Sequence, residues 1–128
     1  MSDDTLQIEL VAADRVVWSG AATEVLARTV DGDLGVLANH APLLSLLVPG
    51  VVEIHPVEGD KFRVAVEEGF LSVADNRVSI LSEDAFLASE INLDQARAEL
   101  ASALEGADDE DDIAVKRAEV KVRAAEKA

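Results

Sequence analysis

The sequence predicts a chain of the β + α class, with an N-terminal antiparallel β-sandwich or flattened barrel followed by a C-terminal antiparallel two-helix hairpin. Two observations lead to this fold class. All three prolines and six of the seven glycines lie at or before residue 69, whereas the last 44 residues contain one glycine and twelve alanines. Apolar residues also recur at strand spacing in the first part and at helical spacing in the second. We place the sandwich domain at residues 1–84 and the hairpin at residues 85–128.

The first part contains short segments with the pattern of half-buried strands. Apolar side chains take every second position in residues 6–10 and 62–66. Further short apolar runs predict strands at residues 16–18, 25–27, 34–37, 51–54, 70–73 and 78–81. The segments Glu58-Gly59-Asp60 and Asp75-Asn76 separate neighbouring runs, as hairpin turns do. Many short strands without a helical spacer favour an antiparallel sandwich or barrel.

The second part contains two helical segments. Asn92 is a good N-cap, and Gln95, three residues later, completes the pattern of a capping box. Gly106 is expected to end this helix. The predicted apolar face of the first helix consists of Leu93, Ala96, Leu100 and Leu104, and that of the second consists of Ile113, Val120 and Ala124. The acidic run at residues 108–112 precedes the second helix, where negative charge is favourable.

The composition excludes several classes of partner. The 128 residues carry a net charge of −15, which disfavours nucleic acid and anionic lipid, because both are bound by Lys/Arg surfaces. The chain has no cysteine, so we expect neither a disulfide nor a thiolate metal site. No segment approaches the roughly 20 apolar residues that cross a bilayer, and the N-terminus does not resemble an export signal. We therefore expect membrane association only through another protein.

The sequence contains no recognisable catalytic or metal-binding motif. It contains no Gly-x-x-x-x-Gly-Lys-Ser/Thr loop for nucleotide phosphates. Neither Asp31-Gly32-Asp33 nor the acidic run at 108–112 continues into the spaced ligands of a calcium loop. Glu67 and Glu68 are expected to be neighbours on a strand, with side chains on opposite faces that do not share one ligand. We predict no catalytic residue, no metal site and no required cofactor.

The stretch from residue 32 to residue 52 places three glycines, two prolines and one histidine at fixed spacing among apolar residues. It resembles the signature of the epsilon subunit of bacterial F-type, proton-translocating ATP synthases, Gly-x-x-Gly-x-x-x-x-His-Ala-Pro-Leu-Leu followed by Pro-Gly. The residues in register are Gly32, Gly35, His40, Ala41, Pro42, Leu43, Leu44, Pro49 and Gly50. Residues 6–14, 69–73 and 76–81 also resemble strands of that family, so the resemblance covers almost the whole chain.

The resemblance implies a non-catalytic rotor subunit. Epsilon subunits dock the sandwich on the gamma subunit and on the ring of c subunits, at the cytoplasmic face of the cell membrane, so that the rotor turns as one body. The residues that match this docking end are Asp31, Gly32, Asp33, His40, Pro42 and Leu43. Solvent-exposed turn acids explain Asp31 and Asp33 equally well. The apolar string at residues 43–48 fits either contact with gamma or packing in the core.

The resemblance also implies a regulatory hairpin. In this family the helices move between a folded form and an extended form that reaches the alpha/beta catalytic hexamer and blocks ATP hydrolysis. Some bacterial members bind ATP in the folded hairpin through Ile/Leu-Asp-x-x-Arg-Ala, which residues 93–98 fit. The residues implied are Leu93, Asp94, Arg97 and Ala98, with Arg117 and Arg123 on the facing helix. An ordinary i, i+3 pair between Asp94 and Arg97 is the alternative interpretation.

A second functional class stays open from the sequence. The chain would then be a free-standing cytoplasmic β-sandwich that binds a small ligand, with the helical hairpin as a lid. That hypothesis predicts a soluble monomer with a pocket lined by convergent polar groups. The rotor hypothesis predicts a protein that co-purifies with washed membranes.

Overall fold

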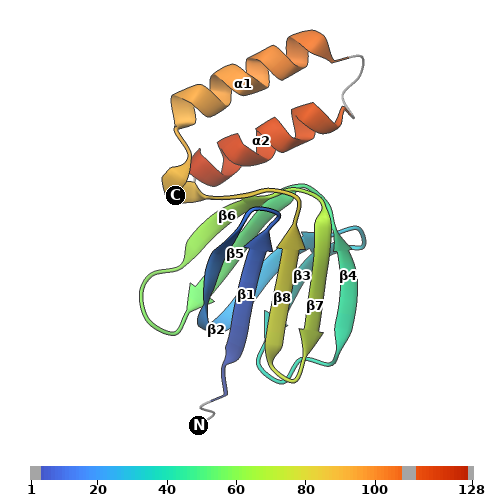
Figure 1. Cartoon of the computed structure of the whole chain (residues 1–128), viewed down its shortest axis with the longest axis vertical. Helices are drawn as coiled ribbons and strands as arrows, with labels where there is room; N and C mark the ends of the chain where they lie inside the picture. The colour runs from blue at the N-terminus through green and yellow to red at the C-terminus, as the bar shows by residue number, and fades with distance from the viewer. Residues whose placement is uncertain (1–3, 108–111, 127–128) are drawn as a thin grey trace.

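The computed structural model describes residues 4–107 and 112–126, and these ranges hold nine strands and two α-helices (Figure 1). The strands are β1 (Leu6–Ala12), β2 (Arg15–Thr29), β3 (Gly32–Leu37), β4 (Leu43–Leu47), β5 (Gly50–Pro56), β6 (Phe62–Val66), β7 (Gly69–Ala74), β8 (Arg77–Ser82) and β9 (Ala85–Leu87). A 3₁₀ turn, η1 (Ala88–Glu90), leads into α1 (Leu93–Gly106) and α2 (Ile113–Glu126). The predicted fold class, a sandwich followed by a helical hairpin, is confirmed.

The strands form one sheet that folds back on itself. Its order is β1-β8-β7-β4-β2-β5-β6-β9, with β3 on β2 and a further pairing between β1 and β2. That pairing joins the two layers seen in Figure 1, where β1, β8, β7 and β4 lie in front of β2, β5 and β6. The pairs are antiparallel except for β1 with β8, which run parallel. The sequence pattern did not predict this parallel pair.

Strand β2 is 15 residues long and serves both layers. Its first half pairs with β1, and its second half pairs with β3 and β5. A register shift between Ala22 and Glu24 marks a bulge, which bends the strand from one layer to the other. The prediction of separate strands at residues 16–18 and 25–27 was therefore wrong, because the interruption between the two apolar runs is this bulge and not a turn.

The last strand lies beyond the boundary expected at residue 84. Strand β9 pairs with β6, with Val66 opposite Ala85 and Val64 opposite Leu87. The sheet therefore continues to Leu87. Three residues are too few to establish a period-two pattern, so periodicity alone does not predict this strand.

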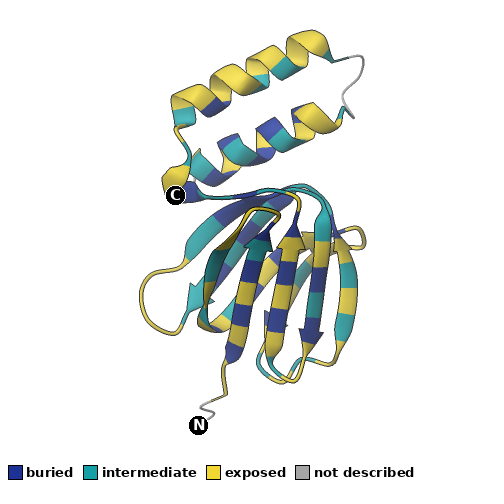
Figure 2. Ribbon diagram, viewed as in Figure 1, coloured by how far each residue is buried: buried dark blue, intermediate teal, exposed yellow. Residues whose placement is uncertain are grey.

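The main core lies between the two layers and consists of large aliphatic side chains. Along β1 the residues alternate between buried and exposed, and the same banding is visible on β8 (Figure 2). The largest fully buried side chains include Leu6, Ile8, Leu10, Ile54, Leu71 and Ile80. Each contributes about 1.5–3 kcal/mol of hydrophobic burial, so this core fixes the sandwich.

Helix α1 begins and ends where the sequence predicts. The Asn92 side chain accepts a hydrogen bond from the Gln95 backbone at 3.0 Å, and Gly106 is the last helical residue. The Gln95 side chain donates forward to Glu99, so only one half of the predicted capping box forms. Leu104, predicted on the apolar face, is 54% exposed.

Helix α2 lies between α1 and the sandwich (Figure 1). Because it is covered on two sides, its buried residues occupy a broad arc and comprise Val115, Ala118, Val120, Val122 and Ala124. The predictions for Val120 and Ala124 are confirmed. Ile113 is 42% exposed, so its predicted place on the buried face was wrong. The expected acidic run falls outside the described residues except for Asp112, whose side chain accepts from the Ala114 backbone at 2.8 Å.

Candidate functional site: an apolar row and a helix clasp

The acidic part of the predicted docking surface is the turn between β2 and β3. Its backbone is held by Thr29, whose hydroxyl accepts a hydrogen bond from the Asp31 backbone at 3.1 Å. Gly32 has φ +114°, a conformation that side-chain-bearing residues rarely adopt. The Asp33 side chain is 85% exposed and lies 4.0 Å from the Arg28 guanidinium. The turn therefore presents two carboxylates to solvent on a backbone shape that glycine makes possible.

The other predicted docking residues lie at the far end of β3. Gly32 is the first residue of β3, and Leu37 is the last. The Leu37 carbonyl accepts a hydrogen bond from the His40 backbone at 3.2 Å, so His40 lies at the Leu37 end. His40 is half-buried, Pro42 is exposed, and Leu43 opens strand β4. The predicted surface therefore separates into two patches at opposite ends of β3, whereas the sequence placed all six residues at one end.

An apolar row crosses the outer face of the front layer. We use this name for Val16, Leu81, Phe70 and Leu46, which are each at least half exposed. Phe70 pairs directly with Leu46 on β4 and with Leu81 on β8, so the three side chains share one face. The row continues from Leu81 through half-buried Val11 to Val16. Neighbouring exposed apolar residues of this kind are typical of interaction surfaces.

Most of the apolar string at residues 43–48, which had two interpretations from the sequence, lies in strand β4. Leu47 is 3% exposed and belongs to the main core, whereas Leu44 is 72% exposed and Leu46 is 50% exposed. Core packing therefore accounts for one face of the strand, and contact of the other face with gamma stays a prediction. Leu44 and Leu46 add to the apolar surface of the front layer.

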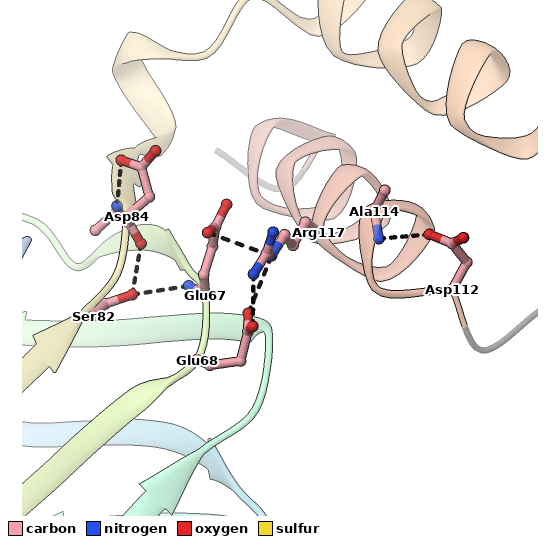
Figure 3. A network of polar contacts seen from close by, with 8 residues as sticks. Glu67, Glu68, Ser82, Asp84, Asp112, Ala114 and Arg117 are labelled. Carbon is pink, nitrogen blue, oxygen red and sulfur yellow. Dashed lines mark hydrogen bonds and ion pairs between the residues drawn. The ribbon is translucent and has the colours of Figure 1, made fainter. Parts of the chain in front are cut away.

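A clasp joins α2 to the sandwich (Figure 3). Glu67 and Glu68 form the turn between β6 and β7, and both face Arg117 on α2. Glu68 accepts from the Arg117 Nε at 3.1 Å and from Nη2 at 2.6 Å, a bidentate pair. The nearest Glu67 oxygen lies 3.4 Å from Nε. The expectation that the two glutamates point to opposite faces was wrong, because β6 ends at Val66 and the pair lies in a turn.

The pKa values of the two glutamates of the clasp are shifted in opposite directions. Hydrogen bonding to Arg117 holds the pKa of Glu68 below its usual range. Burial raises the pKa of Glu67, and the charge of Arg117 offsets this only in part. The turn itself is fixed by Ser82, whose hydroxyl accepts from the Glu67 backbone at 3.0 Å and donates to the Asp84 carbonyl at 2.6 Å (Figure 3).

The residues expected to bind ATP are distributed over different surfaces. Arg97 on α1 lies 4.0 Å from Glu126, near the end of α2, and more than half of its side chain is exposed. Arg117 lies nine residues before Glu126, about 13 Å along the helix, and is engaged in the clasp. Arg123 lines a hollow together with Arg28, Lys116 and Glu68. On α1, Leu93 is half-buried, while Asp94 and Ala98 are exposed.

A mostly apolar hollow of about 360 Å³ opens on the sandwich. Trp18 and Phe62 line it with their rings 5.2 Å apart, and Lys61 stands at its edge. The nearby Glu53 carboxylate is already held by His55 at 2.7 Å and by Arg63. The residues that line the hollow include none from α1 or α2, so the hairpin is not its lid.

Residues 4–107 and 112–126 contain no group of three metal-ligating side chains close enough to hold an ion. Neither helix described there is long and apolar enough to cross a membrane.

Comparison with known families adds an independent result. Residues 5–88 match the family of the ATP synthase delta/epsilon chain, beta-sandwich domain. The chain belongs to this family. Epsilon chains of ATP synthase from Streptomyces avermitilis and Corynebacterium diphtheriae are 50% and 44% identical to it. The alignments cover 93% and 97% of this chain and 94% of each relative. The similarity to these epsilon chains thus extends through the hairpin, beyond the sandwich.

Two solved structures share the fold of this family member. One is a chain of the mitochondrial ATP synthase of Euglena gracilis, from a structure of OSCP, F1 and c-ring, with a TM-score of 0.75 and 23% identity over 98% of this chain and 80% of that chain. The other belongs to the central stalk and c-ring of the Tetrahymena thermophila mitochondrial enzyme, with a TM-score of 0.57 and 18% identity over 99% of this chain and 98% of that chain. At these identities the likeness establishes the fold.

Proposed function

We propose that this chain is the non-catalytic epsilon subunit in the rotor of a proton-driven ATP synthase, where it joins gamma to the c-ring at the cytoplasmic face of the cell membrane. The observation that carries the proposal is the apolar row. Phe70 and Leu81 are each 51% exposed at the centre of a continuous sheet face, which favours burial against another protein. Family membership and the titles of the structural neighbours, which name a central stalk and c-rings, support gamma and the c-ring as partners.

The two loop patches have distinct roles in this proposal. The acidic turn at Asp31 and Asp33 pairs with basic residues on a partner loop, and such rim contacts set orientation and association rate more than affinity. The patch of His40, Pro42 and Leu43 lies at the other end of β3 and contacts a different part of the rotor. A rigid sandwich held at both ends and across one face would transmit rotation without a chemical step of its own.

The hairpin has the regulatory role in this proposal. When it leaves the sandwich it would reach the alpha/beta hexamer and restrain ATP hydrolysis. In this proposal ATP is a regulatory ligand of residues 93–98, with Arg97 as its phosphate-binding residue. Equilibrium dialysis with labelled ATP, comparing the unaltered chain with Arg97→Ala, tests this part, and equal uptake by both proteins would remove it.

The rotor role is tested by reconstitution into ATP synthase from which the resident epsilon subunit has been removed. The variant Phe70→Asp places a charge in the apolar row, while Leu104→Asp places one at a similarly exposed site on α1. We expect Phe70→Asp to lower the affinity for the rotor at least tenfold and to reduce proton-driven ATP synthesis. Leu104→Asp should bind normally. Equal binding by the two variants, with both folded, would contradict the role of the row.

A further inference from the structure

The hairpin is attached to the sandwich through a small contact. Helix α1 packs on α2, and α2 meets the sheet mainly at β5 and β6. The buried residues of that contact are Ala65, Val120 and Ala124, with Val51 and Ile91 beside them. A cluster this small, with two alanines among its three buried residues, supplies little hydrophobic free energy compared with the main core. The polar contacts of α2 therefore have a large share in holding the hairpin.

Two turns of the sandwich bring four carboxylates under α2. Glu67 and Glu68 come from the β6–β7 turn, and Glu83 and Asp84 come from the β8–β9 turn. Backbone hydrogen bonds tie the turns together, from Glu67 to Asp84 at 3.2 Å and from Glu83 to Glu68 at 3.1 Å. Arg117 is the cation that α2 places directly among them. Its approach relieves repulsion within the cluster as well as forming an ion pair.

A second cation on α2 lies one turn further along. Lys121 donates to Glu99 of α1 at 3.2 Å and stands 4.4 Å from the centre of the Phe86 ring on β9. It thus links both helices to the sandwich, and its charge also acts on Glu67. The charged groups around the clasp include Glu83 and Asp84 from the β8–β9 turn and Lys121 from α2. On the Glu68 side, one hollow is lined by Glu68 together with the charged residues Arg28, Lys116, Glu119 and Arg123.

We propose that Arg117 and Glu68 form an electrostatic clasp that holds the hairpin on the sandwich, and that the neighbouring Glu67 opposes it and favours release. The Glu68 carboxylate is 44% exposed and makes two hydrogen bonds to the guanidinium. The Glu67 side chain is only 19% exposed and has a single, longer contact with Arg117. Asp84 adds like charge beside it. Adjacent glutamates in one turn thereby act in opposite directions on docking.

The directions of the pKa shifts agree with this assignment. The pKa of Glu68 is lowered in the docked form, so its contribution is present above the ordinary glutamate pKa and is lost as pH falls through the lowered value. Burial raises the pKa of Glu67 above the ordinary glutamate value, so Glu67 takes up a proton at a higher pH, and we expect loss of its charge in this buried place under α2 to favour docking. Mild acid should therefore tighten the hairpin, and stronger acid should loosen it.

Native-state amide hydrogen exchange on the full-length chain tests the clasp. Amides of α2, such as that of Val120, report opening of the hairpin, and core amides such as that of Ile80 report global unfolding. The variants are Arg117→Gln, Glu68→Gln and Glu67→Gln. The control is Arg123→Gln, which makes the same charge change on the same helix, and for whose residue no ion pair is found in the described part of the chain.

We expect Arg117→Gln and Glu68→Gln to lower α2 protection about tenfold, the size of one charge-assisted hydrogen-bonded pair, with core protection unchanged. Glu67→Gln should raise α2 protection severalfold, and Arg123→Gln should leave it within twofold. The double variant Arg117→Glu with Glu68→Arg should recover part of the loss. Equal effects of Glu67→Gln and Glu68→Gln, or parallel changes in α2 and core amides, would overturn the proposal.

The inference extends the proposed regulatory role, but its test does not depend on that role. Exchange is measured on the isolated chain, without gamma, c-ring or nucleotide. If exchange confirms the clasp but the chain fails to bind the rotor, the inference stands and the proposed function is removed. Normal rotor binding with no effect of Arg117→Gln on α2 would do the reverse.

Discussion

The sandwich and the hairpin are held together by different physical means. The sandwich closes around side chains such as Ile54 and Leu71, which are fully buried. The hairpin contributes Val120 and Ala124 to a separate small cluster and relies on ion pairs at its surface. The first region is stabilised by non-directional burial, and the second depends on a few directional contacts. The hairpin is therefore the region whose attachment is expected to respond most to a change in charge.

This difference predicts that truncating a core residue destabilises the whole chain. Ile80→Ala should lower the free energy of unfolding by about 4 kcal/mol, because a buried β8 side chain leaves a cavity. Val120→Ala should mainly lower exchange protection in α2. Urea denaturation followed by circular dichroism measures the first effect. A loss of global stability from Val120→Ala as large as that from Ile80→Ala would contradict the separation of the two regions.

Replacing a glycine by alanine tests how closely the backbone is packed in each of the two regions. A Cβ at Gly69 would overlap the carbonyl of Leu81 on the paired strand, so Gly69→Ala must push β7 and β8 apart. We expect a loss of about 3 kcal/mol in thermal or urea unfolding. Retention of full stability would mean that β7 and β8 pack less closely than the structure has them.

The cap of α1 should have a smaller effect that stays within the hairpin. Asn92→Ala removes the acceptor for the Gln95 backbone and should destabilise α1 by about 1 kcal/mol. Exchange of amides in the first turn of α1 measures it, and core amides serve as the control. Asn92→Asp, which keeps an acceptor, should retain most of the protection. Equal losses in both variants would show that the cap bond is not the cause.

The smallest effect is expected at the end of α1. A Cβ at Gly106 meets no atom within 4 Å, so Gly106→Ala adds helix propensity without strain. It should stabilise α1 by about 0.5 kcal/mol, the reverse of the result at Gly69. The two alanine variants, compared in the same exchange experiment, separate a glycine required for packing from one that is not. Destabilisation by Gly106→Ala would indicate a constraint on the loop after α1.

Local sequence patterns predicted helix ends correctly, because a capping residue or a glycine favours one backbone geometry there. Asn92 capped α1 and Gly106 ended it as expected, because both act within a single turn. The bulge in β2 was missed because it depends on which strands lie on either side. Ile113 was misplaced because the helical period gives the face of a residue but not where along the helix that face is covered, and Ile113 is the first residue of α2.

The candidate sites were predictable only in part. The family motif identified the Asp31 turn, but nothing local indicates that β3 separates it from His40. Phe70 could have been found from the alternation of β7, since Leu71 and Val73 take the inner positions. The clasp could not, because Glu68 and Arg117 are 49 residues apart and meet only when α2 docks. Pairings of this kind depend on tertiary geometry.

Rotor binding by two single variants, measured in one assay, tests most directly whether the sheet face of the sandwich docks the chain. ATP synthase lacking its epsilon subunit is titrated with the chains Phe70→Asp and Arg117→Gln, and the bound fraction of each is recorded. Phe70→Asp should bind at least tenfold more weakly, because the sheet face is proposed to dock on the rotor. Arg117→Gln should bind as the unaltered chain does, because the clasp is proposed to hold only the hairpin. Normal binding by Phe70→Asp, with its fold intact, would contradict the account.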